Sequence, residues 1–249
     1  MTDILSPELV LKYTYDVTSA DCDMQARLRP GGLVNYLILS AINSADALGF
    51  GFEGLRGQNL FWVLSRMTIE IYKPMKWYDK AVVETWPKDV DGLLYLRDFI
   101  VRNQHGEVTA RCTSGWLAID IHSKRPRKVD EKHSYIFDRM KGKNALENRP
   151  EKLSSVEIGE PSLVKTTWFD LDLNKHVTST RYVDWMMDAL PADLLSDNYP
   201  SRLSINFMRE TVANETVRII RAVKGERIFR FEGTIDPGEK PSFRGTIAF

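Results

Sequence analysis

Three polar residues spaced two apart, Asp172, Asn174 and His176, are the part of this sequence best suited to chemistry. In an extended segment such residues point to one face, so a carboxylate, an amide and an imidazole would lie together. A helical pattern follows at 178–190, and the N-terminus of that helix would stabilise an oxyanion developing on a carbonyl. Helix capping is the structural alternative, because Asp, Asn, Ser and Thr commonly precede helices.

The segment that holds these residues occurs twice in the chain. Residues 22–28 align without a gap on 171–177, which places Asp23 over Asp172. A second block, 66–69, aligns on 202–205 in the same order. Two blocks in one order with one apolar pattern indicate a duplication, which has to be found before a fold is assigned.

Each copy predicts the same elements. A short strand and turn lead into a helix, at 32–48 in the first copy and 178–190 in the second. Strand-like runs then follow at 66–72, 80–86, 93–102 and 109–121, and again at 202–208, 216–223, 227–232 and 242–249. A helix followed by consecutive strands predicts an antiparallel sheet packed on a helix. We therefore expect an α+β fold, a tandem or double hotdog, with an N-terminal hotdog at 1–130, a polar linker at 131–155 and a C-terminal hotdog at 156–249.

The two copies differ at the positions that could do acid–base or hydrogen-bonding work. The first copy has Gln25, Arg27 and Pro74 where the second has Asn174, His176 and Glu210. A pair of fused units needs only one working site, so we expect catalysis in the second half and a degenerate site in the first. Asp172 is the weaker candidate, because its equivalent Asp23 persists in the degenerate copy.

The stretch 169–185 resembles the acyl-carrier-protein (ACP) thioesterases, a family best known from plant plastids. The stretches 59–67 and 77–86, the pair Arg97–Asp98 and the turn at Gly106–Glu107 are similar to that family as well, so the likeness runs from about Tyr13 to the C-terminus. The resemblance implies tandem hotdog enzymes that hydrolyse fatty acyl-ACP to free fatty acid. Because no transit peptide precedes the first block, we expect the bacterial branch.

The same resemblance places the family's catalytic Asp, Asn, His and Glu on Asp172, Asn174, His176 and Glu210. It implies attack by water, with Glu210 or His176 as the base; an acyl-anhydride route through Glu210 is the alternative. Plant members often carry Cys directly after the Glu, whereas this chain has Thr211. A Cys–His mechanism is therefore not expected unless a distant cysteine folds in.

In the resemblance, acyl chain-length selection belongs largely to the first half. The candidate substrate-binding residues there are Leu33, Leu37, Ala41, Trp62, Leu64 and Met67, for which simple core packing is the alternative. The basic run 122–128 is suited to docking an acidic acyl carrier protein, or it begins a solvated linker. Its candidate docking residues are Lys124, Arg125, Arg127 and Lys128.

Composition excludes several function classes. Lys plus Arg and Asp plus Glu are both 34, so no bulk charge indicates nucleic acid. No uncharged run approaches the roughly 20 apolar residues that span a bilayer, and the start of the chain lacks a signal pattern. Two cysteines are too few for a disulfide framework and suit a reducing compartment. We therefore expect a cytoplasmic protein. One His with scattered carboxylates supplies no metal ligand set, and we expect no cofactor.

Three other functions stay open on the sequence. They are an acyl-CoA or aryl-CoA thioesterase on the same fold, a hotdog hydratase that adds water to an enoyl thioester, and a non-catalytic module that binds acyl groups or their carrier. Acyl chain length, ACP-versus-CoA selectivity and oligomeric state, including a homodimer, are not determined by the sequence.

Overall fold

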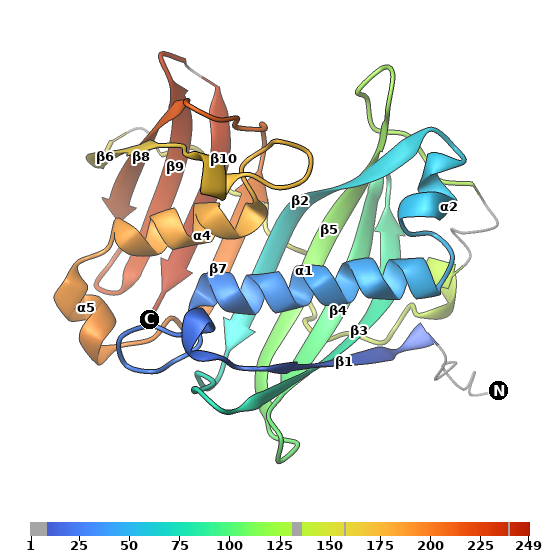
Figure 1. Cartoon of the computed structure of the whole chain (residues 1–249), viewed down its shortest axis with the longest axis horizontal. Helices are drawn as coiled ribbons and strands as arrows, with labels where there is room; N and C mark the ends of the chain where they lie inside the picture. The colour runs from blue at the N-terminus through green and yellow to red at the C-terminus, as the bar shows by residue number, and fades with distance from the viewer. Residues whose placement is uncertain (1–8, 131–135, 157, 239) are drawn as a thin grey trace.

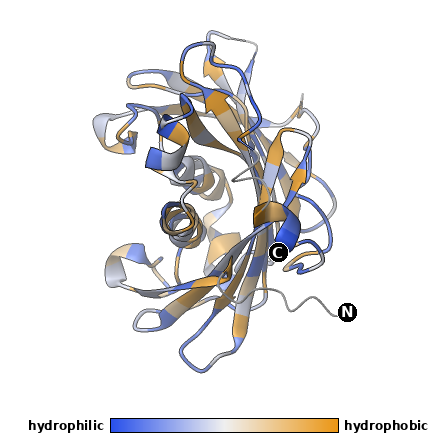
Figure 2. Ribbon diagram, turned by 90° about the vertical axis from the view of Figure 1, so that its right-hand side faces the viewer, coloured by the Kyte–Doolittle hydropathy of each residue, from blue (hydrophilic) through white to orange (hydrophobic). Residues whose placement is uncertain are grey.

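The computed structural model describes residues 9–130, 136–156, 158–238 and 240–249. Ten antiparallel strands form one sheet in the order β1-β3-β4-β5-β2-β7-β10-β9-β8-β6. The sheet curves around helices α1 and α4, which lie side by side in its concave face (Figures 1 and 2). This is the α+β double hotdog that the sequence predicted, with one long helix and five strands in each half.

The first half contains β1 (Leu11–Asp16), α1 (Pro30–Ala47), α2 (Phe52–Arg56), β2 (Leu60–Ile71), β3 (Lys80–Asp91), β4 (Leu94–Arg102) and β5 (Val108–Asp120). The second half contains β6 (Glu160–Lys165), α4 (Ser179–Asp188), α5 (Ala192–Asp197), β7 (Arg202–Phe207), β8 (Thr216–Val223), β9 (Ile228–Asp236) and β10 (Pro241–Ala248). Short 3-10 turns, η2 (Ser19–Asp21) and η3 (Trp168–Asp170), stand before α1 and α4.

The duplication is visible in the order of the strands in the sheet. From one edge the order is β1-β3-β4-β5-β2, and from the other edge it is β6-β8-β9-β10-β7, which are the equivalent strands of the second half. The halves join where β2 pairs antiparallel with β7, and Thr68 lies opposite Ser204 with their hydroxyl oxygens 3.1 Å apart. These two residues are 136 positions apart and occupy the same place in their own halves. Residues related in this way are called counterparts below.

Helix α1 begins at Pro30, where the missing N–H costs nothing, and ends before Gly49, which has a φ of 81°. Its predicted start was two residues later. Helix α4 ends at Asp188, two residues before its predicted end. The helices approach closely at Gly31, where an added Cβ would lie 2.2 Å from Oδ1 of Asp184. The interface between the halves is therefore tight at the N-terminus of α1.

Strand β2 begins at Leu60, six residues before the predicted start, because residues 60–64 pair with the end of β5. The predicted linker starts with residues 131–135, which lie outside the described part of the chain. Beyond them, Phe137 packs against Phe50 and Tyr95 on the α1 side of the sheet. Ala145 lies on the opposite face, where its N–H donates a hydrogen bond to the buried carboxylate of Asp98. Among the described residues, no helix is both long and apolar enough to cross a membrane.

Candidate active site

The segment that carries the candidate residues is a tight loop, not the extended chain that the spacing predicted. Its two ends form an isolated antiparallel bridge, and Lys175 within it has a φ of 64°. The Asp172 carboxylate accepts hydrogen bonds from the backbone N–H groups of Asn174, at 2.8 Å, and His176, at 3.2 Å. A short acidic side chain that bonds its own backbone in this way turns the chain. Asp172 therefore stabilises the turned conformation of the loop.

The loop brings His176 to Glu210, which follows the end of β7. Nε2 of His176 lies 3.2 Å from Oε2 of Glu210, and their side chains are 32% and 59% exposed. The backbone holds the two segments together, because the N–H of Val177 donates to the carbonyl oxygen of Thr211 at 2.8 Å. An imidazole and a carboxylate in contact, both open to solvent, can together take a proton from a water molecule.

Asn174 is exposed on the same loop, and its side-chain amide makes no hydrogen bond to any residue in the described part of the chain. Helix α4 begins just beyond, with Thr178 as its N-cap residue. Asp172 is not the cap, so the capping alternative does not explain it. The free amide and the N–H groups at the start of α4 are the hydrogen-bond donors that a developing oxyanion needs.

The equivalent loop in the first half has the same backbone and different chemistry. Asp23 accepts hydrogen bonds from the N–H groups of Gln25 and Arg27, both at 2.9 Å, and Ala26 has a φ of 56°. The Arg27 guanidinium then donates to the carbonyl oxygens of Leu195, at 2.7 Å, and Asn198, at 3.1 Å. At the position of His176, the first half therefore has an arginine that forms hydrogen bonds to the second half.

Neither cysteine lies in the loop of His176. Cys22 precedes the equivalent loop of the first half, and Cys112 is completely buried in β5. Burial raises the pKa of both thiols, that of Cys112 well above its usual value. Thr211, which follows Glu210, is buried. Within the described residues, no cluster of three or more His, Cys, Asp or Glu side chains could hold a metal ion.

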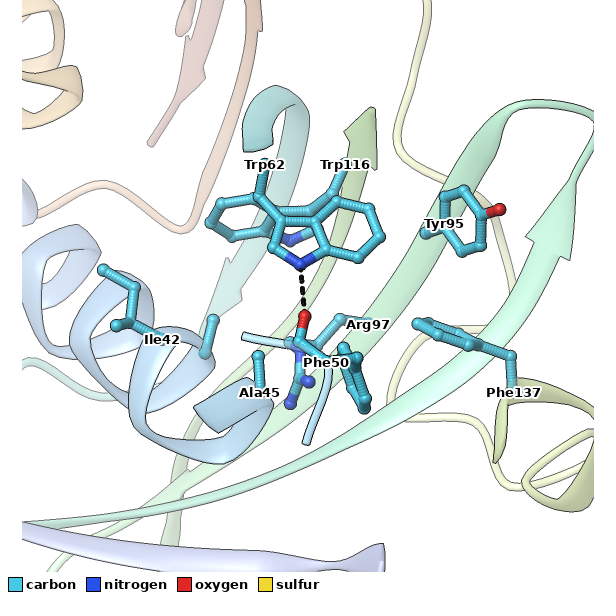
Figure 3. A pocket seen from close by; sticks show the side chains of 9 residues that line it. Ile42, Ala45, Phe50, Trp62, Tyr95, Arg97, Trp116 and Phe137 are labelled. Atoms are coloured by element: carbon cyan, nitrogen blue, oxygen red, sulfur yellow. Dashed lines mark hydrogen bonds between the residues drawn. The ribbon is translucent and has the colours of Figure 1, made fainter. Parts of the chain in front are cut away.

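An apolar cavity lies in the first half between the C-terminal part of α1 and the sheet (Figure 3). Its empty volume is about 380 Å³, part of which is open to solvent. Two of the six predicted substrate-binding residues, Ala41 and Trp62, line it. The other four are buried in the core beside it: Leu33, Leu37, Leu64 and Met67. Their role in binding remains a prediction.

The cavity and the His176–Glu210 pair lie at the same end of the sheet. The pairing of β2 with β7 stops where Arg66 meets Asn206, and β2 extends beyond that point on the side from which Glu210 emerges. Trp62 lies in this extension, and its indole N–H donates to the carbonyl oxygen of Phe50 at 2.8 Å (Figure 3).

The basic loop also lies at this end, because β5 finishes at Asp120 opposite Leu60. All four candidate docking residues in it are exposed. Arg127 forms an ion pair with Asp120 at 2.7 Å, and Nζ of Lys124 lies 5.4 Å from the centre of the Phe61 ring.

Seven further residues of the cavity wall were not predicted from the sequence: Ile42, Ala45, Phe50, Tyr95, Arg97, Trp116 and Phe137. A signal was present in β4, where alternate residues share a face. Arg97 alternates with Tyr95 and Phe99, which places a charged side chain on an apolar face of the sheet. The pair Arg97–Asp98 entered only as part of the family resemblance.

Comparison with known proteins gives consistent matches. Residues 8–136 match the acyl-ACP thioesterase N-terminal domain, and residues 154–242 match the C-terminal domain of the same family. The solved structure of an acyl-ACP thioesterase from Bacteroides thetaiotaomicron is 25% identical and superposes with a TM-score of 0.91, covering 98% of this chain and 99% of that one. The 12:0-ACP thioesterase from Umbellularia californica, at 21% identity and a TM-score of 0.83 over 96% and 93% of the two chains, shows the same fold.

Among curated proteins, the chloroplastic oleoyl-acyl carrier protein thioesterase 1 of Arabidopsis thaliana is 28% identical over 211 residues. That match covers 78% of this chain and 58% of the relative. The chain thus spans less than two thirds of the length of the plant relatives that it matches.

Proposed function

The chain belongs to the acyl-ACP thioesterase family, and we propose that it hydrolyses the thioester of fatty acyl-ACP to free fatty acid and holo-ACP. The observation that carries the proposal is the contact between Nε2 of His176 and Oε2 of Glu210 at 3.2 Å. The first half, with Arg27 and Pro74 at the equivalent positions, has no such pair.

In the proposed reaction, the thioester carbonyl lies beside the N-terminus of α4. The His176–Glu210 pair takes a proton from water as the water oxygen bonds to the carbonyl carbon. The Asn174 amide and the N–H groups at the helix start stabilise the resulting oxyanion. Collapse of this intermediate breaks the carbon–sulfur bond, and the thiolate leaving group recovers the proton from the pair. Asp172 acts as a positioning residue that holds the loop in shape.

The division of labour between the halves is part of the proposal. The N-terminal hotdog, 1–130, would bind the acyl chain, and the C-terminal hotdog, 156–249, would carry catalysis, with 131–155 connecting them. The apolar cavity supports the first assignment because it lies at the end of the sheet where Glu210 lies. The basic loop at that end suits an acidic carrier protein. We propose a cytoplasmic location and assign neither cofactor nor metal.

The test compares hydrolysis of the same acyl group presented on ACP, on CoA and on pantetheine, over a range of chain lengths, with the acid product identified by mass. We expect the highest kcat/KM with acyl-ACP and loss of turnover in Glu210→Gln. Equal or faster hydrolysis of acyl-CoA would assign the chain to the CoA-dependent alternative. Hydration of an enoyl thioester with the thioester intact would assign it to the hydratases, and binding without turnover to carrier-binding modules.

A further inference from the structure

Three large apolar side chains are exposed around the loop that carries His176. Trp168 and Phe169 belong to η3, just before the loop, and Leu173 lies inside it, three positions before His176. Their exposed fractions are 80%, 93% and 102%. Exposed apolar residues are ordinary when scattered, whereas three within six positions beside a candidate active site indicate an interaction surface. We call these three residues the apolar rim.

The fold does not require the two aromatic side chains of the rim. In the first half, η2 begins with Ser19 and Ala20 at the places of Trp168 and Phe169. Both 3-10 turns have the same capping box, formed by a Thr before the turn and an Asp at its end. The same local structure thus forms with small residues in one half and with aromatic residues in the other. Because the aromatic pair is exposed, it adds no buried core area, and we attribute it to binding.

Two cations flank the rim in the sequence, at places where the first half has none. Strand β6 ends at Lys165, whereas β1 ends at Asp16. The residue of positive φ in the loop is Lys175, whereas the first loop has Ala26 there. Both lysines are exposed, and neither side chain forms an ion pair or a hydrogen bond with a described residue. Unpaired cations beside exposed aromatic residues suit a partner that is acidic and offers an apolar surface.

We infer that the apolar rim is a docking surface for the carrier protein that delivers the acyl group. The inference rests on the proposed function for the identity of this partner. The thioester reaches His176 only if the carrier comes to rest beside this loop, where the rim is exposed. Lys165 and Lys175 complement the acidic charge of the carrier, and the rim supplies apolar area that the carrier can bury. The basic loop at 122–128 attracts the same partner over distance, whereas the rim holds it in contact.

The test measures binding of holo-ACP whose thiol carries an alkyl thioether, which resembles the substrate but cannot be hydrolysed. The same alkyl thioether of pantetheine, which lacks the carrier protein, is the control ligand, and both are made over a series of alkyl lengths. Calorimetry on the full chain compares wild type with the double variant Trp168→Ser, Phe169→Ala, which gives η3 the residues that η2 carries. The Kd for the ACP ligand should rise at least about tenfold, and the Kd for the pantetheine ligand should not change.

Leu173→Ser and Met24→Ser form a matched pair of variants. Met24 occupies the place of Leu173 in the first loop and is itself 91% exposed. Leu173→Ser should raise the Kd for the ACP ligand about threefold or more, and Met24→Ser should leave it unchanged. If the double variant fails to fold, this pair decides alone. Ionic strength separates the rim from the basic loop: the fold loss caused by the rim variants should be the same at low and high salt, because salt screens charges and not apolar contacts.

Equal Kd values for the ACP ligand in wild type and the rim variants would overturn the inference. An equal loss for both ligands would overturn it too, since it would place the rim at the acyl chain or its arm. Rim-dependent binding to vesicles of phosphatidylglycerol and phosphatidylcholine, with ACP binding unchanged in the variants, would assign the rim to a lipid surface instead. The proposed function fails separately: rim-dependent binding of the ACP ligand, without hydrolysis of any thioester, would leave the docking surface standing.

Discussion

The N–H of Val177 donates to the carbonyl oxygen of Thr211 at 2.8 Å, and the neighbours of these two residues are His176 and Glu210. In the first half, the N–H of Leu28 donates to the carbonyl oxygen of Met75 at the same distance. The same backbone contact thus frames both loops, and the side chains beside it differ. A change in the first loop is therefore a matched control for the same change in the second.

The His176–Glu210 pair should be essential to turnover and nearly irrelevant to stability. We expect His176→Ala and Glu210→Gln each to lower kcat/KM about 10²- to 10⁴-fold, because each removes one member of the proton-transfer pair. Both side chains are substantially exposed, so the free energy of unfolding should stay within about 0.5 kcal/mol. Initial rates and thermal denaturation measure the two effects. Wild-type rates in Glu210→Gln would remove Glu210 from the mechanism.

Asn174 and Gln25 test the oxyanion contact. We expect Asn174→Ala to lower kcat about 10²- to 10³-fold, since it removes one donor to the intermediate. Gln25→Ala, at the equivalent place in the first half, should leave kcat unchanged. Steady-state kinetics on both variants decide the matter. Equal losses in the two would show that the side chain acts through loop structure.

For activity, the hydrogen-bond acceptor oxygen of Asp172 should matter more than its negative charge. Asp172→Asn keeps Oδ1 for the N–H groups of Asn174 and His176, so most activity should remain. Asp172→Ala removes the acceptor and should cost about 1–2 kcal/mol of stability along with activity. Asp23→Ala should destabilise the chain as well, because Asp23 accepts the same backbone bonds. If Asp172→Asn is as inactive as Asp172→Ala, the charge of Asp172 takes part in the reaction.

The cysteines should be dispensable. Burial raises the pKa of the Cys22 and Cys112 thiols, so both are mainly protonated at neutral pH and neither is activated as a nucleophile. The double variant Cys22→Ser, Cys112→Ala should keep kcat/KM within about threefold of wild type once any loss of stability is allowed for. Thiol alkylation of the native enzyme should likewise leave the rate unchanged. Inactivation by alkylation that the double variant escapes would restore a cysteine to the mechanism.

The basic loop should set affinity for the carrier protein without affecting chemistry. Reversing Lys124, Arg125 and Lys128 to Glu should raise KM for acyl-ACP about tenfold and leave kcat unchanged. Arg127 is kept, since its ion pair with Asp120 helps to hold the loop. Acyl-pantetheine, which lacks the carrier, is the control substrate and should show no change. An equal rise in KM for both substrates would locate the effect in the acyl or pantetheine site.

The sequence by itself indicated the duplication and the double hotdog, and it predicted the group Asp172, Asn174, His176 and Glu210. Periodic apolar residues and a repeated loop pattern are local signals, and local signals survive in a linear chain. The persistence of Asp23 even indicated that Asp172 has a structural duty. The difference between Arg27 and His176 indicated that the candidate site lies in the second half.

Only the tertiary structure decided what depends on distant contacts. Whether His176 contacts Glu210 depends on where β7 ends relative to the loop of residues 171–177, which lies some 34 positions earlier in the chain. That loop is tightly turned, whereas the spacing of its polar residues predicted an extended segment. The cavity is lined by residues of α1, β2, β4 and β5 together with Phe50 and Phe137, so spacing along any one element could not separate wall from core. Arg97 looks like an ordinary strand residue until its neighbours are known, because the lack of a partner for its buried Nη2 among the described residues is a property of the packed molecule.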